Sequence, residues 1–161
     1  MLTTTTPQIS FKLPLVNLGT AVAALAVPEE KVFAAIEEGR IAFAFDFSSC
    51  GCKRVAVRIL AQSLADFQNR KPVSTASDAE QFNQAVRLIF PAVTTKPGGI
   101  QTVRAVTIYR RLCINHDHAA RLVRDGEMRL AKGAKFRRGP TGSPEVEFSS
   151  VVEFLKRRRI A

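Results

Sequence analysis

The sequence has no tryptophan, one tyrosine and three cysteines among its 161 residues. An odd number of cysteines in a chain long enough to bury its own core argues against a disulfide framework, so we expect reduced thiols. Its apolar runs, such as Ala21–Val27, are far shorter than the roughly 20 residues that cross a bilayer. No basic start precedes an apolar signal segment. We therefore expect a cytoplasmic protein without membrane association.

Acidic residues are also scarce relative to basic ones. The chain carries 24 Lys and Arg against 14 Asp and Glu, a net charge of +10. Its hydrophobic content of 46% is ordinary for a globular protein, and its length allows one ordinary domain or two small ones. These values exclude a large multidomain enzyme, and the positive field predicts a polyanionic partner, nucleic acid before an anionic membrane surface.

The positive charge is concentrated in the last third of the chain. Residues 101–161 hold 14 Lys and Arg against 6 Asp and Glu, a net of +8, whereas residues 1–70 and 71–100 each have a net of +1. A polyanion-binding surface built from the C-terminal third would produce this distribution. The alternative is a solvated basic face without a partner.

The hydrophobic pattern predicts a similar order of short elements in both halves of the chain. After a frayed start, the N-terminal half should form, in order, a strand at Ile9–Val16, helices at Gly19–Ala26 and at residues 29–38, strands at Ile41–Phe47 and Arg54–Leu60, and a helix at Ser63–Asn69. Gly39 would end the second helix in the left-handed conformation. A capping box formed by Ser77 and Glu80 should start a further helix that ends before Pro91.

The sequence aligns with itself at a shift of 87 residues. Ala21–Ile41 then lies on Ile108–Met128 without a gap, and Gly39 meets Gly126. The same shift places Ser63–Phe67 on Ser150–Phe154. Two separated blocks at one shift indicate a repeated supersecondary unit, with chance similarity of two short helix pairs as the alternative.

Each copy would contain two helices joined by a tight turn, a glycine, a hairpin with a basic loop and a closing helix. This order is typical of a winged helix-turn-helix. It resembles the winged-helix domains of phage and integrative-element excisionases and of MerR-type regulators. The residues that carry the resemblance are Val32-Phe33-Ala34-Ala35-Ile36-Glu37-Glu38-Gly39-Arg40-Ile41 in the first copy, Ala119-Ala120-Arg121-Leu122-Val123-Arg124-Asp125-Gly126-Glu127-Met128 in the second, and the two blocks that begin at Ser63 and Ser150.

The resemblance implies an α+β fold of two tandem winged helix-turn-helix modules, mainly helical with small antiparallel β-hairpin wings. The first module would span residues 1–70, a connector with one helix at about 77–90 would span 71–100, and the strongly basic second module would span 101–161. The family usually caps its second helix with Ser or Thr; Asn115 can serve in that place, whereas Pro28 cannot. The long dimerisation helix and effector domain of a MerR-type regulator have no counterpart here, so we do not expect ligand sensing.

The second copy has the residues expected of a duplex-DNA reader. Its second helix should turn His116, His118, Arg121 and Arg124 outward, and Arg121 is the strongest candidate for a base contact because Arg can bond guanine O6 and N7 together. Asn115 at the start of that helix is a further DNA-binding candidate, since Asn can read adenine. A glycine-rich basic loop and a basic tail should follow the phosphate backbone. The remaining DNA-binding candidates are Lys132, Lys135, Arg137 and Arg138 in the loop, Lys156, Arg157 and Arg158 in the tail, and Lys53 and Arg54 in the first hairpin. The alternatives are solvent-facing arginines on an ordinary helix, and a tail whose charge complements a helix dipole.

Other chemistry is poorly represented. Cys50, Cys52, Cys113, His116 and His118 lack the spacing of a zinc site, and no phosphate-binding glycine motif or nuclease acid cluster is present. We therefore expect no metal, no cofactor and no enzymatic activity.

The expected function is binding of double-stranded DNA by an excisionase-like architectural factor or a small transcriptional regulator, located with the nucleoid in the cytoplasm. The protein would act as a monomer or homodimer, with a recombinase or transcription protein as a possible partner. Two alternatives remain open. One is a protein-interaction adaptor, such as an anti-activator or a recombination or replication accessory. The other is binding of structured RNA, and the near absence of exposed aromatic candidates counts against single-strand stacking.

Overall fold

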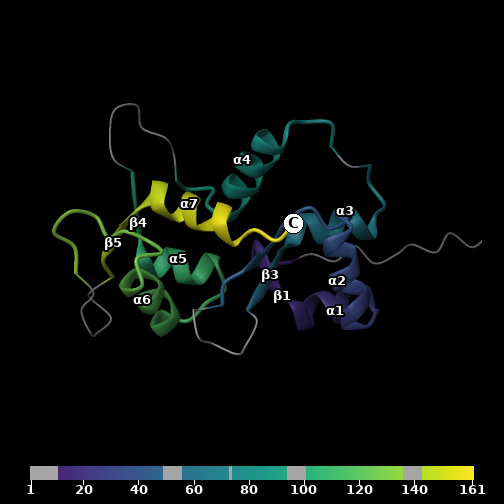
Figure 1. The fold of residues 1–161 in the computed structure, drawn as a ribbon, viewed down its shortest axis with the longest axis horizontal. Coiled ribbons are helices and arrows are strands. Elements are labelled where there is room, and N and C mark those ends of the chain that lie inside the picture. The colour runs from purple at the N-terminus through teal and green to yellow at the C-terminus, as the bar shows by residue number, and fades with distance from the viewer. Residues whose placement is uncertain (1–10, 49–55, 73, 94–100, 136–142) are drawn as a thin grey trace, which may run out of the picture.

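The computed structural model describes residues 11–48, 56–72, 74–93, 101–135 and 143–161. Within these ranges the chain forms seven α-helices and five short strands arranged in two small antiparallel sheets (Figure 1). The expected α+β class is therefore confirmed. In the part of the chain that is described, none of the helices has the length and apolar character needed to cross a membrane.

The N-terminal half forms a three-stranded sheet with helices on it. Its elements are β1 (Leu15–Asn17), α1 (Leu18–Leu25), α2 (Glu29–Glu37), β2 (Ala44–Asp46), β3 (Val57–Leu60) and α3 (Ala61–Gln68). The strand order is β1-β3-β2, with β3 antiparallel to both neighbours. Strands β2 and β3 are shorter than the hydrophobic alternation predicted. The first strand begins at Leu15, the first residue to pair with β3, and residues 9 and 10 of the expected strand lie outside the described part.

The C-terminal half has a similar element order after the connecting helix. Its elements are α4 (Asp78–Ile89), β4 (Thr102–Arg104), α5 (Ala105–Arg111), α6 (His116–Arg124), β5 (Glu145–Glu147) and α7 (Phe148–Arg158). Strands β4 and β5 pair antiparallel, and Leu130 forms an isolated bridge with Val146. The hairpin of the second repeat thus consists of strand β5 and a facing segment that pairs with it through the single bridge at Leu130.

The local signals in the sequence explain where several helices begin and end. Ser77 accepts the Glu80 N–H at 3.3 Å and the Glu80 carboxylate accepts the Ser77 N–H at 3.0 Å, so the expected capping box starts α4. Pro28 precedes α2, whose first turn carries Glu29 and Glu30. These acids lie at the positive end of the helix dipole, where negative charge is stabilising.

The elements recur at the shift of 87 residues. Strand β4 and helix α6 have the bounds of β1 and α2 displaced by 87. The hydrogen bond from the Ala61 N–H to the Pro14 carbonyl, 2.9 Å, has its equivalent between Phe148 and Gln101, also 2.9 Å. In the hairpins the shift changes by one, since the N–H of Leu60 bonds the Phe43 carbonyl whereas Glu147 bonds Arg129. We call β1 to α3 the first repeat and β4 to α7 the second repeat.

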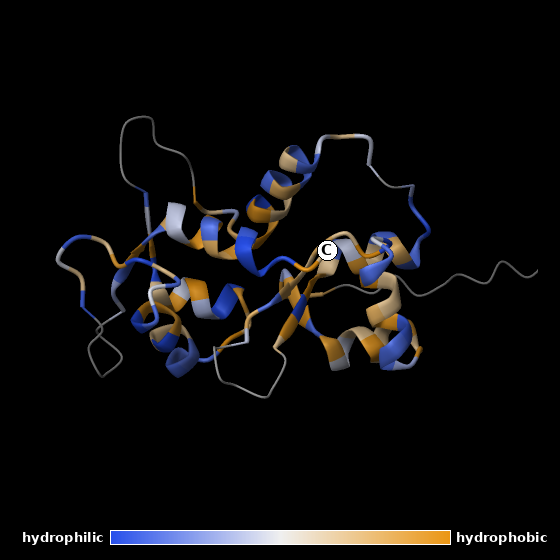
Figure 2. Ribbon diagram, in the orientation of Figure 1, coloured by the Kyte–Doolittle hydropathy of each residue, from blue (hydrophilic) through white to orange (hydrophobic). Residues whose placement is uncertain are grey.

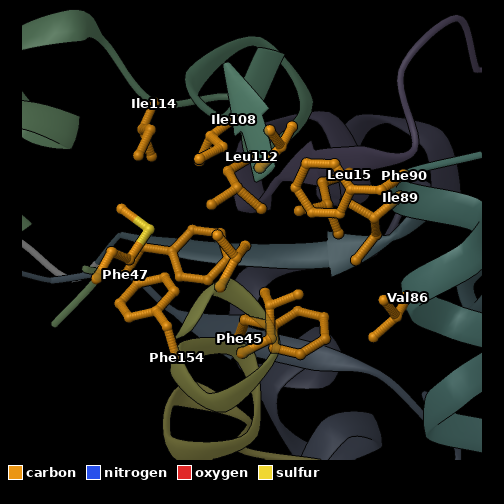
Figure 3. Packing of buried hydrophobic residues seen from close by; sticks show 14 of the residues in the cluster. Leu15, Phe45, Phe47, Val86, Ile89, Phe90, Ile108, Leu112, Ile114 and Phe154 are labelled. Atoms are coloured by element: carbon orange, nitrogen blue, oxygen red, sulfur yellow. The ribbon is translucent and has the colours of Figure 1, made fainter. Parts of the chain in front are cut away.

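The two repeats bury apolar side chains against each other through the three-stranded sheet. Alternate residues of the strand around β2 point to opposite faces, as the pleat requires. Ala44 packs in a core made within the first repeat, whereas Phe43, Phe45 and Phe47 pack in a second core with α4 and the second repeat. Figure 3 shows Phe47 beside Phe154 of α7, and their ring centroids are 5.4 Å apart. The alternating phenylalanines therefore form the face that joins the repeats.

The end of α7 also returns to the first repeat. The Ile160 N–H bonds the Ala44 carbonyl at 2.9 Å, and Arg159 forms a β-bridge with Phe45. Because β2 is an edge strand of its sheet, this segment covers backbone groups that would otherwise form an open sheet edge.

Candidate nucleic-acid interface

Helix α6 is placed by a tight turn that follows α5. Cys113 in this turn adopts a left-handed φ of 55°, and the Asn115 side chain then caps α6 by accepting the His118 N–H at 2.7 Å. The expected capping role of Asn115 is thus confirmed. Ala119 and Leu122 turn inward and are 2% and 0% exposed. The helix is therefore anchored along one side and open along the other.

The open side of α6 carries four of the five predicted residues. Asn115, His116, Arg121 and Arg124 are all exposed. Arg121 and Arg124 project from α6 away from the buried Ala119 and Leu122, and Asn115 and His116 are exposed at its N-terminal end. Asp117 and Asp125 are also exposed on this segment, so the basic character of the surface depends on cations outside the helix as well.

His118 lies differently from these four residues. It is half-buried, and it hydrogen-bonds the backbone of Phe47 in the first repeat. Burial lowers the pKa of its imidazole, the bond to Phe47 opposes that change, and the neighbouring guanidinium groups of Arg121 and Arg58 lower the pKa further. His118 therefore belongs to the contact between the repeats rather than to the outward face.

The hairpin of the second repeat contributes two described cations. Lys132 and Lys135 are exposed, and Gly133 between them has a φ of +82°. Figure 1 shows this segment extending from the same end of the molecule as α6. The predicted contacts Arg137 and Arg138, and Lys53 and Arg54 of the first hairpin, lie outside the described residues.

The basic tail is bound to the protein itself. Arg157 donates to the backbone carbonyl of Glu127 at 2.8 Å and to its carboxylate at 3.1 Å, and Arg158 donates to the same carboxylate at 2.8 Å. The Lys156 ammonium lies 5.6 Å from the centre of the Phe82 ring. Figure 2 shows this last turn of α7 as strongly hydrophilic. Since Glu127 follows α6 closely, the tail fastens the region beyond the C-terminal end of that helix.

Several arginines outside the predicted set are exposed on the second repeat or hold its elements in place. Arg104 and Arg110 are exposed cations of the second repeat, at the beginning of α5 and in its last turn. Arg129 bonds Glu147 at 3.0 Å and Glu153 at 3.1 Å, which joins the hairpin to α7. Arg58 of the first repeat bonds the turn before α6. The charge count of the C-terminal third indicated the first three, but no local pattern indicated Arg58.

The equivalent helix of the first repeat has an acidic surface. Glu29, Glu30, Glu37 and Glu38 of α2 and its C-cap are exposed, against a single cation, Lys31. Arg40 pairs with Glu38 and so does not extend a basic surface. The inward residues of α2 pack only within the core of the first repeat. The surface of α2 and its C-cap is therefore net negative, whereas on α6 and its C-cap two arginines balance two aspartates.

A cavity between α3 and α4 lies away from α6. It has a volume of about 190 Å³ and is lined in part by Asp66, Phe67 and Gln81, with no His or Cys in its lining. Asp66 already bonds Lys71 at 2.9 Å and Gln62 at 2.9 Å. Within the described ranges, no three His, Cys, Asp or Glu side chains come together as a set of metal ligands. Cys50 and Cys52 fall outside those ranges.

The geometry of the second repeat is thus a short exposed helix, its capped N-terminus and a cationic hairpin at one end of the molecule (Figure 1). Comparison with protein-family models, curated proteins and solved structures found no match for the chain.

Proposed function

We propose that the protein is a non-enzymatic double-stranded-DNA-binding protein built from two tandem winged helix-turn-helix modules. It would act as an excisionase-like architectural factor or a small transcriptional regulator. The observation that carries this proposal is the recurrence of strand, helix, turn, helix, hairpin and helix at 87 residues, with a net charge of +8 in residues 101–161 against +1 in residues 1–70. The winged helix-turn-helix places its second helix in a major groove and its hairpin along the backbone.

Helix α6 supplies the side chains for base contacts. Its exposed Arg121 lies one turn after Asp117 and one turn before Arg124–Asp125, near the middle of the outward face. A guanidinium there can donate two parallel hydrogen bonds to guanine O6 and N7, and each such pair contributes about 1–3 kcal/mol of discrimination. The exposed Asn115 amide at the helix start is a second candidate, for adenine.

The hairpin supplies contacts that do not depend on sequence. Lys132 and Lys135 are exposed on the described part of it, and Arg137 and Arg138 follow in the sequence. Each phosphate that these cations neutralise releases counterions, which makes binding strongly dependent on salt. The hairpin would set affinity and register, and α6 would set sequence preference.

The first repeat does not read DNA in this proposal. The four exposed glutamates on and beside α2 would approach phosphates of like charge, at a cost of about 1 kcal/mol for each pair at 4 Å even in water. One chain therefore reads a single half-site. The first repeat supports the second through their shared core.

A titration of fluorescent duplexes tests the proposal. The protein is added to a random 25-base-pair duplex and to enriched duplexes selected from a random library, at two salt concentrations. We expect binding at low salt, with the logarithm of the association constant falling by about 0.9 per phosphate contact for each tenfold rise in salt. Absence of binding at low salt would overturn the proposal.

A second candidate is a protein-interaction adaptor that contacts nucleic acid only loosely. The observation that favours it is the exposed acidic surface of α2, at the position equivalent to the reading helix. Capture from lysate with and without nuclease separates the two functions. An adaptor retains its partner after nuclease treatment, whereas proteins bridged by DNA are lost. A charge-neutral α2 variant carrying Glu29→Gln, Glu30→Gln and Glu37→Gln should abolish capture only if the adaptor function holds.

A further inference from the structure

We propose that Arg58 of the first repeat is a positioning residue for the DNA-reading helix α6. The inference rests on the proposed function, because it concerns how α6 is aimed. It assigns the first repeat a role in sequence preference without any contact between that repeat and DNA.

Arg58 forms a forked contact with the turn before α6. Its Nε and Nη2 donate to the carbonyl oxygen of Cys113 at 3.2 and 2.9 Å, and its Nη1 donates to the carbonyl of Val57 at 3.0 Å. The planar guanidinium therefore links the backbone of β3 to the backbone of the turn. Two donors on one acceptor fix direction as well as distance, which a single flexible ammonium does not do.

The turn is held a second time from the same sheet. The Cys113 thiol lies 3.1 Å from the carbonyl oxygen of Leu15 in β1. Strand β3 is the central strand and pairs with β1 and β2, so both contacts arise from a supported part of the sheet. His118, in the first turn of α6, bonds the Phe47 backbone close to β2. Strands β1 and β3 thus contact the turn before α6, and the residue after β2 contacts the first turn of α6.

Among the described residues, the contact between Arg58 and the turn before α6 has no counterpart at the turn between α1 and α2. Ala26 is the equivalent of Cys113, and Glu145 is the equivalent of Arg58 at the shift of 87 residues. A carboxylate cannot donate to a backbone carbonyl. Glu145 instead accepts a hydrogen bond from the hydroxyl of Thr102 at 2.9 Å. The contact of Arg58 with the turn, which we call the Arg58 clamp, is therefore specific to the turn before α6.

The Arg58 clamp lies where it can control the orientation of α6. Cys113 has a left-handed φ of 55°, and only Ile114 separates it from the cap Asn115. A small rotation at this turn would swing α6 relative to the hairpin. Bidentate base contacts depend on such geometry, whereas attraction between hairpin cations and phosphates tolerates it. Loss of Arg58 should therefore reduce sequence preference more than general DNA affinity.

The test compares Arg58→Gln with Arg40→Gln in the full chain, after selection of a preferred duplex for the wild type. Both variants remove one positive charge from the first repeat, but Arg40 bonds Glu38 and has no contact with the turn among its described bonds. We expect Arg58→Gln to lower the ratio of preferred to random duplex affinity about tenfold while leaving the salt dependence unchanged. Arg40→Gln should leave the ratio unchanged, and Arg58→Lys should recover part of it.

The outcomes separate three explanations. A salt dependence that weakens by about 0.9 in Arg58→Gln would mean that Arg58 itself contacts phosphate, which would overturn the positioning role. An equal loss of affinity for both duplexes at matched folded protein would overturn it as well, because a positioning residue should affect the preferred duplex more than the random one. An unchanged ratio would also contradict the inference while leaving DNA binding intact.

A second variant tests the same contact through another residue. A measurement without DNA tests the contact independently of the proposed function. Cys113→Ala removes the thiol contact without changing charge, and we expect a smaller loss of the same ratio. Amide hydrogen exchange should rise at residues 113–119 in both variants and stay unchanged in Arg40→Gln. Unchanged exchange there would overturn the clamp. Failure of the wild type to bind any duplex would instead overturn the proposed function.

Discussion

Ala26 and Cys113 lie 87 residues apart and both adopt the left-handed backbone conformation, with φ of 52° and 55°. Neither is glycine, so each retains a strained conformation that L-residues seldom adopt outside particular turns. Each lies in the turn that joins the two helices of its repeat. The backbone of the turn is thus the same in both repeats, although only one turn is clamped by Arg58.

Glycine is required where each second helix ends. Gly39 and Gly126 have φ of +69° and +78°, and a Cβ at either would meet no atom within 4 Å. The cost of Gly39→Ala or Gly126→Ala is therefore conformational, and we expect each to lower the free energy of unfolding by about 1 kcal/mol. Chemical denaturation measures the change.

The matched control for these glycines is Gly19→Ala in α1. Its φ is not in the left-handed range, and the added Cβ would make an ordinary contact of 3.6 Å with the Asn17 carboxamide oxygen. Because alanine favours a helix, we expect an increase of about 0.5 kcal/mol. Equal effects of all three substitutions would contradict the conformational explanation.

Much of the fold follows from local signals in the sequence. The capping pattern at Ser77 and Glu80, the proline before α2 and Gly39 after it predict helix ends that the structure has. The alternation of phenylalanines predicts the strand, but it does not say what covers them. Phe47 meets Phe154 from the other end of the chain, and contacts of that separation leave no trace in a local pattern.

Asn115 has a capping role that can be separated from a base contact. Its carboxamide oxygen accepts the His118 N–H at 2.7 Å. Asn115→Ala should lower the free energy of unfolding by about 1 kcal/mol through loss of the cap. Asn115→Ser keeps a capping oxygen and should leave stability within a few tenths of a kcal/mol, yet it removes the amide that would recognise adenine. A Ser variant that binds preferred and random duplexes as the wild type does would show that Asn115 is only a cap.

Substitutions of Arg121 and of the hairpin arginines should change DNA binding in different ways. Arg121→Ala should reduce affinity for the preferred duplex by about 1–3 kcal/mol and relax preference at one base position. Arg137→Ala combined with Arg138→Ala should weaken binding to every duplex. The double substitution should also reduce the salt dependence of the association constant by the contribution of about two phosphate contacts. Lys31→Ala on α2 is the charge control and should change neither quantity. Similar losses from the Arg121 and hairpin variants would contradict the division of roles.

The sequence predicts the orientation of candidate site residues only where that orientation depends on neighbours within the same helix. The helical period places Ala119 and Leu122 inward, and Arg121 and Arg124 outward. The same reasoning placed His118 outward, yet it faces Phe47, because the neighbour that covers it is 71 residues earlier in the chain. The tail arginines were expected to be available to phosphate, and their pairing with Glu127 depends on how α7 crosses the end of α6.

The ion pair between Asp78 and Arg159 should make stability sensitive to acid. Both guanidinium Nη atoms contact the carboxylate, at 2.8 and 3.1 Å. The hydrogen bond and charge of Arg159 hold the pKa of Asp78 below its ordinary value of 3.8. A carboxyl whose pKa is lower in the folded state stabilises the fold above its unfolded pKa and loses that contribution as pH falls through the folded pKa. Wild type should therefore exceed Asp78→Asn in stability by a constant amount from neutral pH to about pH 5, and the difference should shrink below 3.8.

Urea denaturation of both proteins across this pH range is the measurement. Arg159→Gln is the reciprocal variant, and it should lose the same acid-sensitive part. It should also lose a part that does not depend on pH, because the Arg159 guanidinium lies 4.5 Å from the centre of the Phe43 ring and covers it. A difference between wild type and Asp78→Asn that is as large at pH values well below 3.8 as at neutral pH would show that the ion pair is not its source. A pH-independent deficit in Arg159→Gln alone would assign that part to the ring contact, which joins the end of the second repeat to the sheet of the first.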